Sequence, residues 1–162
     1  MKYEITDIAC EDNPKLFRIR ALANIPAIGV KAGTLGGCVE GEHNLSQEGD
    51  CWVSANARVY GNAQVYRNSR VYGNARVYGY ATVFGNAQVF ENASLSENSR
   101  VSDSARVFGR VHVCGNAWVS GNAQVSGSFI VTANVHKNMQ IDIMWDEDAY
   151  VEWFFTHKRQ AA

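Results

Sequence analysis

The sequence is dominated by a six-residue period that runs unbroken from residue 53 to residue 136. The first residue of each of these fourteen hexads is Val, except for Leu95, and the fifth residue is Ala in nine of them. A short, fixed period indicates a stack of similar units, each burying its apolar face against the next. The period therefore predicts an all-β solenoid for this part of the chain.

A single hexad shows how the units are built. Residues 57–62 read Ala-Arg-Val-Tyr-Gly-Asn, and the first four alternate as a half-buried strand does. Ala57 and Val59 are predicted to point inward, and Arg58 and Tyr60 outward. The closing Gly-Asn pair has the chemistry of a tight turn, because both residue types tolerate positive φ. Each hexad is thus predicted to be a short strand followed by a corner.

An aliphatic first residue and a small fifth residue resemble the hexapeptide repeat of left-handed parallel β-helix proteins, whose best-known members are acyltransferases. The resemblance implies three hexads per triangular coil, left-handed coiling, and trimers packed side by side. The string VKAG-LGG-VE at residues 30–40, followed by NLS-GDCW-V from residue 44, is similar to YdcK-like β-helix proteins of bacteria and of phage or prophage genomes. We interpret its glycines as a tight entry into the first coil, since no phosphate-binding fingerprint is present.

The chain is predicted to form three segments. The alternation in residues 3–7 and 16–20 indicates a hairpin that covers the open end of the solenoid. Near the other end, an acidic cluster precedes an apolar run that ends in basic residues, which favours a short α-helix. The predicted boundaries are 1–34 for the capping hairpin, 35–136 for the left-handed β-helix, and 137–162 for a C-terminal capping segment with the helix.

Charge and cysteine content limit the environment of the chain. The N-terminus lacks the apolar region of a signal peptide and no long apolar run is present, which favours a cytoplasmic protein without a membrane span. The four cysteines show no CxxC spacing, so reduced thiols and no metal are expected. Cys51 occupies a fifth position and is predicted to be a buried small apolar residue.

Stacking at the family's interval sorts the outward residues into three faces. These columns permit two interpretations: the aromatic rings stabilise neighbouring coils, or they form an interface for self-association. Both remain open from the sequence. The candidate interface residues are Arg70, Arg106, Tyr72, Phe90 and Phe108 on the first face, and Arg58, Arg76, Tyr60 and Tyr78 on the second.

Catalysis is disfavoured, because family acyltransferases carry a His base on or near a loop that interrupts the coils, and this repeat has no such loop. His112 is a weak catalytic candidate, with Cys114, Ser94 and Ser96 nearby. We predict a non-catalytic interaction or scaffold protein of phage or prophage type, a homotrimer without a cofactor. One alternative is an acyl-CoA-dependent acyltransferase with sites between subunits; another is sequestration of a nucleotide-type ligand or a partner protein. Nucleic-acid binding is disfavoured by the net charge of -1.

Overall fold

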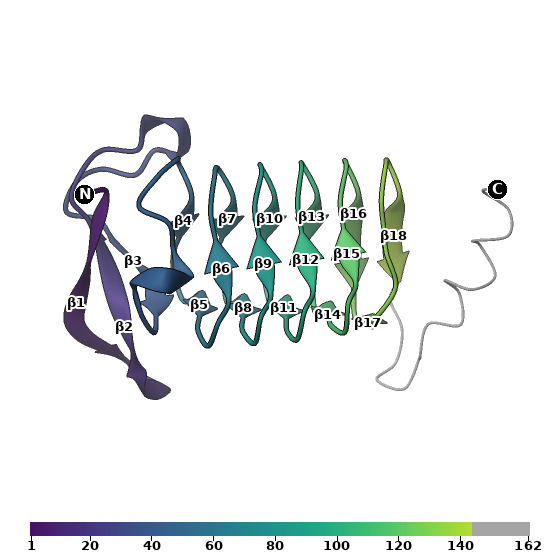
Figure 1. Ribbon diagram of the computed structural model, residues 1–162, viewed down its shortest axis with the longest axis horizontal. Helices are drawn as coiled ribbons and strands as arrows, with labels where there is room; N and C mark the ends of the chain where they lie inside the picture. Colours follow the sequence, from purple (N-terminus) through teal and green to yellow (C-terminus); the bar gives the residue numbers. More distant parts are fainter. Residues whose placement is uncertain (144–162) are drawn as a thin grey trace, which may run out of the picture.

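The fold is an all-β parallel solenoid, seen in a computed structural model that describes residues 1–143 (Figure 1). Short strands recur along its body, one in each hexad. Two turns of 3-10 helix, η1 (Pro26–Ile28) and η2 (Glu42–Asn44), lie before the regular repeat. The strands are β1 (Tyr3–Cys10), β2 (Asn13–Ala21), β3 (Leu35–Val39), β4 (Trp52–Val53), β5 (Arg58–Val59), β6 (Gln64–Val65), β7 (Arg70–Val71), β8 (Arg76–Val77), β9 (Thr82–Val83), β10 (Gln88–Val89), β11 (Ser94–Leu95), β12 (Arg100–Val101), β13 (Arg106–Val107), β14 (His112–Val113), β15 (Trp118–Val119), β16 (Gln124–Gly127), β17 (Ile130–Val131) and β18 (Gln140–Ile143).

Successive strands pass to successive faces, so the strands sort into three sheets. Sheet 1 contains β4, β7, β10, β13, β16 and β18; sheet 2 contains β1, β2, β3, β5, β8, β11, β14 and β17; sheet 3 contains β6, β9, β12 and β15. Within the repeat the pairing is parallel and joins residues eighteen apart, as Gln88 pairs with Arg106 and Arg58 with Arg76. The predicted stacking interval is therefore confirmed, whereas the left-handed coiling stays a prediction from the resemblance.

The interior is built from the first and fifth residues of the hexads, as predicted. Val71, Val89 and Val107 form one interior column, and each is 0% exposed. Ala57 and Ala75 are equally buried at the fifth position. Small residues at this position let the three walls approach closely, while the branched Val side chains fill the space between them.

The corners differ from the prediction in one respect. Positive φ falls on the third residue of the hexad, such as Gly61 (φ 64), and the Asn that follows does not share it. The Asn side chains instead bond along the corner from turn to turn, as Asn56 donates to Asn74 at 3.4 Å. Glu91 also occupies the left-handed position, and its carboxylate accepts the N–H of Gly109 at 2.8 Å. An acid can therefore replace Gly here because it satisfies the backbone of the next turn.

The last turn corrects both the predicted register and the predicted end of the solenoid. Val119 bridges to Val135 and Gln124 pairs with Gln140, so this turn is two residues shorter than the regular eighteen-residue turns, whereas the first coil, in which Val39 pairs with Val59, is two residues longer. Val135, predicted to fill a fifth position, lies instead in a first-position column, where a branched side chain fits better than in an Ala site. The stack then continues past His136 into β18. The predicted C-terminal helix lies outside the described residues.

The N-terminal hairpin is present, with longer strands and a tighter turn than predicted. β1 pairs with β2, and β2 pairs antiparallel with β3, so the hairpin extends sheet 2. The Gly36-Gly37 pair permits this close entry into the first coil. A Cβ atom at Gly36 would lie 2.6 Å from the Val53 carbonyl oxygen, and one at Gly37 would lie 2.5 Å from that of Ala57. This packing supports the tight-entry interpretation of the two glycines.

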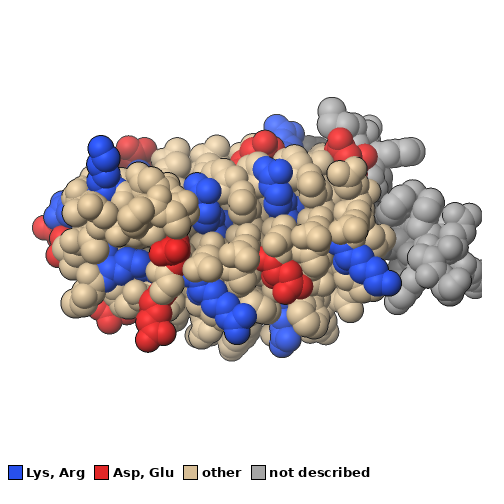
Figure 2. Space-filling view, turned by 90° about the horizontal axis from the view of Figure 1, so that it is seen from above, with Lys and Arg blue, Asp and Glu red and all other residues tan. Residues whose placement is uncertain are grey.

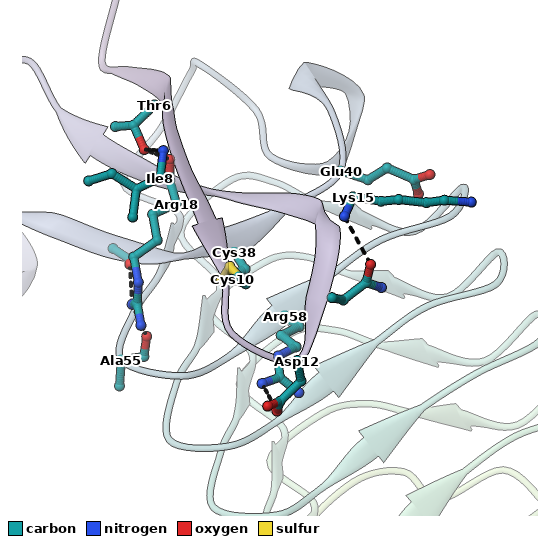
Figure 3. The surroundings of a disulfide bond; sticks show 12 residues. Thr6, Ile8, Cys10, Asp12, Lys15, Arg18, Cys38, Glu40, Ala55 and Arg58 are labelled. Atoms are coloured by element: carbon teal, nitrogen blue, oxygen red, sulfur yellow. Dashed lines mark hydrogen bonds and ion pairs between the residues drawn. A yellow bond between two sulfur atoms is a disulfide. The ribbon is translucent and has the colours of Figure 1, made fainter.

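The expectation of reduced thiols is wrong for two of the four cysteines. Cys10 and Cys38 form a disulfide between the end of β1 and strand β3 (Figure 3). Sequence spacing alone does not show this pair, because the hairpin brings the two residues together in space. Cys51 is free and fully buried as predicted, and Cys114 is free and half-buried.

Candidate binding surface

Each strand presents two outward side chains on either side of its inward Val. We call the residue before the Val the leading residue and the residue after it the trailing residue; in β13 these are Arg106 and Phe108. Because the strands are in register, leading and trailing residues form separate columns along each sheet. All candidate interface residues predicted from the sequence lie in such columns, but on two different sheets.

The trailing column of sheet 1 contains a continuous stack of three aromatic rings. The centroids of Tyr72 and Phe90 are 4.8 Å apart with an interplanar angle of 1°, and those of Phe90 and Phe108 are 4.8 Å apart at 5°. Phe90 is only 9% exposed, whereas its two neighbours are half-buried. The column is thus a rigid aromatic strip whose middle ring is already covered within one chain.

Two arginines of sheet 1 lie against these rings. The Arg70 guanidinium is 5.2 Å from the Tyr72 centroid, and that of Arg106 is 5.1 Å from Phe90 and 5.6 Å from Phe108. At these distances the positive charge is attracted to the ring faces. The five sheet 1 residues predicted from the sequence therefore form one contiguous surface.

The sheet 2 candidates differ in whether the hairpin contacts them. Tyr60 and Tyr78 stack at 5.2 Å. Arg58 forms an ion pair with Asp12 in the hairpin turn, while Arg76 is exposed (Figure 3). Tyr60 also packs against a small apolar cluster beneath the hairpin, and burial, followed by the neighbouring Tyr78, raises its pKa. The hairpin thus occupies the first part of this column.

His112 bonds to Ser96, a residue of the preceding turn. Its Nε2 atom lies 2.7 Å from the Ser96 hydroxyl oxygen, and Ser96 is buried. Burial lowers the pKa of the imidazole, partly opposed by the carboxylate of Glu97, and burial raises the pKa of the Cys114 thiol. A neutral imidazole beside a serine hydroxyl has the composition of a nucleophile and base pair. The other two candidates from the sequence, Cys114 and Ser94, do not hydrogen-bond to the ring.

The same diagonal contact recurs where catalysis is not at issue. The Trp118 indole N–H donates to the Ser102 hydroxyl at 2.7 Å, and the Tyr72 hydroxyl donates to Gln88 at 3.0 Å. Like the His112–Ser96 contact, each joins a leading residue to the trailing residue sixteen positions earlier. The contact is therefore a packing feature of the solenoid, in which a leading side chain leans across the preceding turn.

Where the trailing residue is small, the leaning ring fills the space that an aromatic side chain occupies elsewhere. On sheet 3, Tyr66 and Phe84 stack at 5.1 Å, and the next trailing residue is Ser102, which is 0% exposed beside Trp118. On sheet 2, Ser96 follows Tyr60 and Tyr78 in the same manner. Sequence analysis missed the pairing of Ser102 with Trp118. A small trailing residue followed sixteen positions later by a large ring is the signal that reveals it.

The charged side chains on the face shown in Figure 2 are distributed along the body and do not merge into one basic patch. Within residues 53–136 the sequence has seven Arg, no Lys and three acids. Nucleic-acid binding requires a concentrated basic footprint, so this distribution does not favour it. Within residues 1–143, no helix has the length and apolar character needed to cross a membrane.

This geometry defines the class of protein as a parallel β-solenoid with short repeats and aromatic columns on its outer faces. Residues 57–73 and 69–85 match the family model of the YdcK β-solenoid repeat. The matched segment thus consists of YdcK-type repeats, which confirms the resemblance at the level of the repeat. No curated protein matches the chain.

Proposed function

We propose that this protein is a non-catalytic β-solenoid interaction module that self-associates side by side as a homotrimer through the sheet 1 surface. The observation that carries the proposal is the unbroken stack of Tyr72, Phe90 and Phe108 with Arg70 and Arg106 against it. Aromatic residues and Arg are enriched in the cores of protein interfaces. The flanking rings of Tyr72 and Phe108 retain exposed edges for such a contact.

Rigidity favours this surface energetically. Association costs free energy when mobile side chains become ordered at an interface. The rings of sheet 1 are already held by their stacked neighbours, so little side-chain entropy remains to be lost. The extended flat sheet also offers a long contact to a second copy.

Light scattering coupled to gel filtration tests the proposal. The wild-type mass is expected to be three times the chain mass of 17.9 kDa. Phe108→Ser should shift the mass toward the monomer, because it removes a half-buried ring at the end of the stack. Phe84→Ser is the matched control in the sheet 3 stack and should leave the mass unchanged. A wild-type monomer at micromolar concentration, or an equal effect of both variants, contradicts the proposal.

A second candidate function is acyl-CoA-dependent acyl transfer, favoured by the 2.7 Å contact between His112 and Ser96. The imidazole would act as the base, and a neighbouring subunit would have to close the site. Release of CoA from acetyl-CoA, lost in His112→Ala with mass and melting temperature preserved, would support this function. Binding of acyl-CoA without CoA release would not, since an aromatic, basic groove can hold a nucleotide without chemistry.

A further inference from the structure

The tip of the N-terminal hairpin, residues 10–16, lies over the outer face of sheet 2. Cys38 immediately precedes the buried Val39 and pairs with Arg58, so it occupies the leading, outward position of that face. A disulfide from Cys10 to Cys38 therefore places the end of β1 on the outside of the first coil (Figure 3).

Apart from this bond, the tip is attached weakly. The register between β2 and β3 extends only to Phe17 and Val39, so the tip lies beyond their pairing. In the ion pair of Asp12 with Arg58, the Asp12 side chain is 68% exposed, so solvent screens the contact, although the Arg58 side chain is only 17% exposed. The remaining contact is a small cluster of Cys10, Leu16 and Cys38, against which Tyr60 packs.

The residues beneath the tip belong to the leading and trailing columns of sheet 2, and both columns continue beyond the tip. Arg58 and Tyr60 lie beneath the tip, and one turn further the columns continue with Arg76 and Tyr78. Arg76 is exposed, and within residues 1–143 it forms no ion pair with the hairpin. The tip thus contacts one arginine–tyrosine pair, whereas in the next pair Arg76 is exposed and Tyr78 is half-buried like Tyr60.

We propose that the Cys10–Cys38 disulfide is a redox-controlled clasp that holds the hairpin tip over Arg58 and Tyr60, and that its reduction uncovers this pair. The rest of the cap stays attached, because Arg18 donates to the carbonyl oxygens of Gly36 at 3.0 Å and Ala55 at 2.9 Å, independently of the disulfide. The proposal does not depend on the sheet 1 assembly.

The reaction is ordinary thiol–disulfide exchange with a dithiol reductant. One thiolate of the reductant attacks a sulfur of the pair and releases the other cysteine as a thiolate, which takes up a proton. The second thiol of the reductant then attacks the mixed disulfide. The products are two protein thiols and one oxidised reductant, so two electrons pass to the protein.

Hydrogen–deuterium exchange of the full chain, oxidised and then reduced with dithiothreitol, tests the clasp. Reduction should speed exchange of the backbone amides where Cys10 pairs with Asn13 in the tip by about tenfold or more, while residues 53–131 keep their protection. Cys51→Ser should preserve this response. The Cys10→Ser/Cys38→Ser variant should show fast tip exchange in both conditions.

Hydroxyl-radical footprinting, performed without reductant, measures the uncovering itself. Tyr60 should be modified faster in Cys10→Ser/Cys38→Ser than in the wild type, while Tyr78, its stacked neighbour, serves as the internal reference. Three results would overturn the proposal: four free thiols in the air-oxidised wild type, unchanged tip exchange and Tyr60 labelling, or loss of protection across the whole solenoid on reduction.

Discussion

The repeat body, residues 53–136, and the N-terminal cap, taken together with the irregular first coil as residues 1–52, cover the same apolar interior in different ways. In the body, outward side chains such as the stacked rings contact the equivalent side chains of the turns before and after them. When one of them is removed, the contacts among the remaining turns are kept. In the cap, single side chains make contacts that nothing else repeats. The ammonium group of Lys2, for example, donates to the carbonyl oxygens of Glu48, Gly49 and Cys51. In the body, the loss of stability caused by a substitution should therefore depend on whether the side chain points inward or outward. In the cap, it should depend on which partner the side chain contacts.

The largest effect is expected inside the body. Val89→Asp places a carboxylate where the side chain is 0% exposed and has no polar partner, at a cost of more than about 4 kcal/mol. Urea unfolding, or the absence of folded protein, measures it. Gln88→Asp is the matched control, because the adjacent side chain points outward, and it should cost less than about 1 kcal/mol. Unchanged melting of Val89→Asp would contradict the register.

In the cap, Asn44→Ala should have the next largest effect. Asn44 is 0% exposed; its side-chain oxygen accepts the N–H groups of Glu40 and Gly41, and its amide donates to the carbonyl oxygens of Gly61 and Ala63. Removing it breaks these four hydrogen bonds, one of them to the buried carbonyl of Ala63, at about 2–4 kcal/mol in chemical unfolding. Asn74→Ala, in the exposed corner ladder, should lose less than about 1 kcal/mol. Equal losses would show that cap and body do not differ in this way.

A smaller, pH-dependent effect is expected at His112. Because burial lowers its pKa in the folded state, the unfolded chain binds the proton more readily. Stability should thus be complete above the ordinary His pKa of about 6.5 and fall as the pH drops below it. Melting curves between neutral and mildly acidic pH should show a smaller decline for His112→Gln than for the wild type. His136→Gln, which replaces an exposed ring, should decline as the wild type does.

The sequence was sufficient to predict the body because its pattern is local and repeats. The inward Val and Ala residues follow from the order of residues within one hexad, whereas the eighteen-residue interval was implied by the resemblance to hexapeptide-repeat proteins. The prediction was wrong in the last turn. Val occurs at both the first and the fifth position of the hexads, so the residue type of Val135 does not show which of the two positions it occupies. Only the pairing with Val119 distinguishes them.

The cap and the surface pairs depended on contacts that no local pattern specifies. The Cys10–Cys38 disulfide requires the hairpin to fold over the outer face of β3, and the spacing of the cysteines does not indicate this. The sequence placed His112 near Ser94, Ser96 and Cys114. Which of these residues hydrogen-bonds to the imidazole depends on the direction in which the ring points. The recurrence of the same lean at Trp118 is visible only once side chains are placed.

The central claim is that a large leading side chain packs against the trailing residue sixteen positions earlier. The contact of His112 with Ser96 is one example of this packing. The most direct measurement is the melting temperature of Ser96→Tyr/His112→Ser, which moves the ring from the leading position to the trailing one and extends the Tyr60–Tyr78 stack. Each single change should lower the melting temperature by about 3 °C or more, since one crowds the site and the other leaves a gap. The double variant should return to within about 2 °C of the wild type. A double variant no more stable than the less stable single variant would contradict the claim.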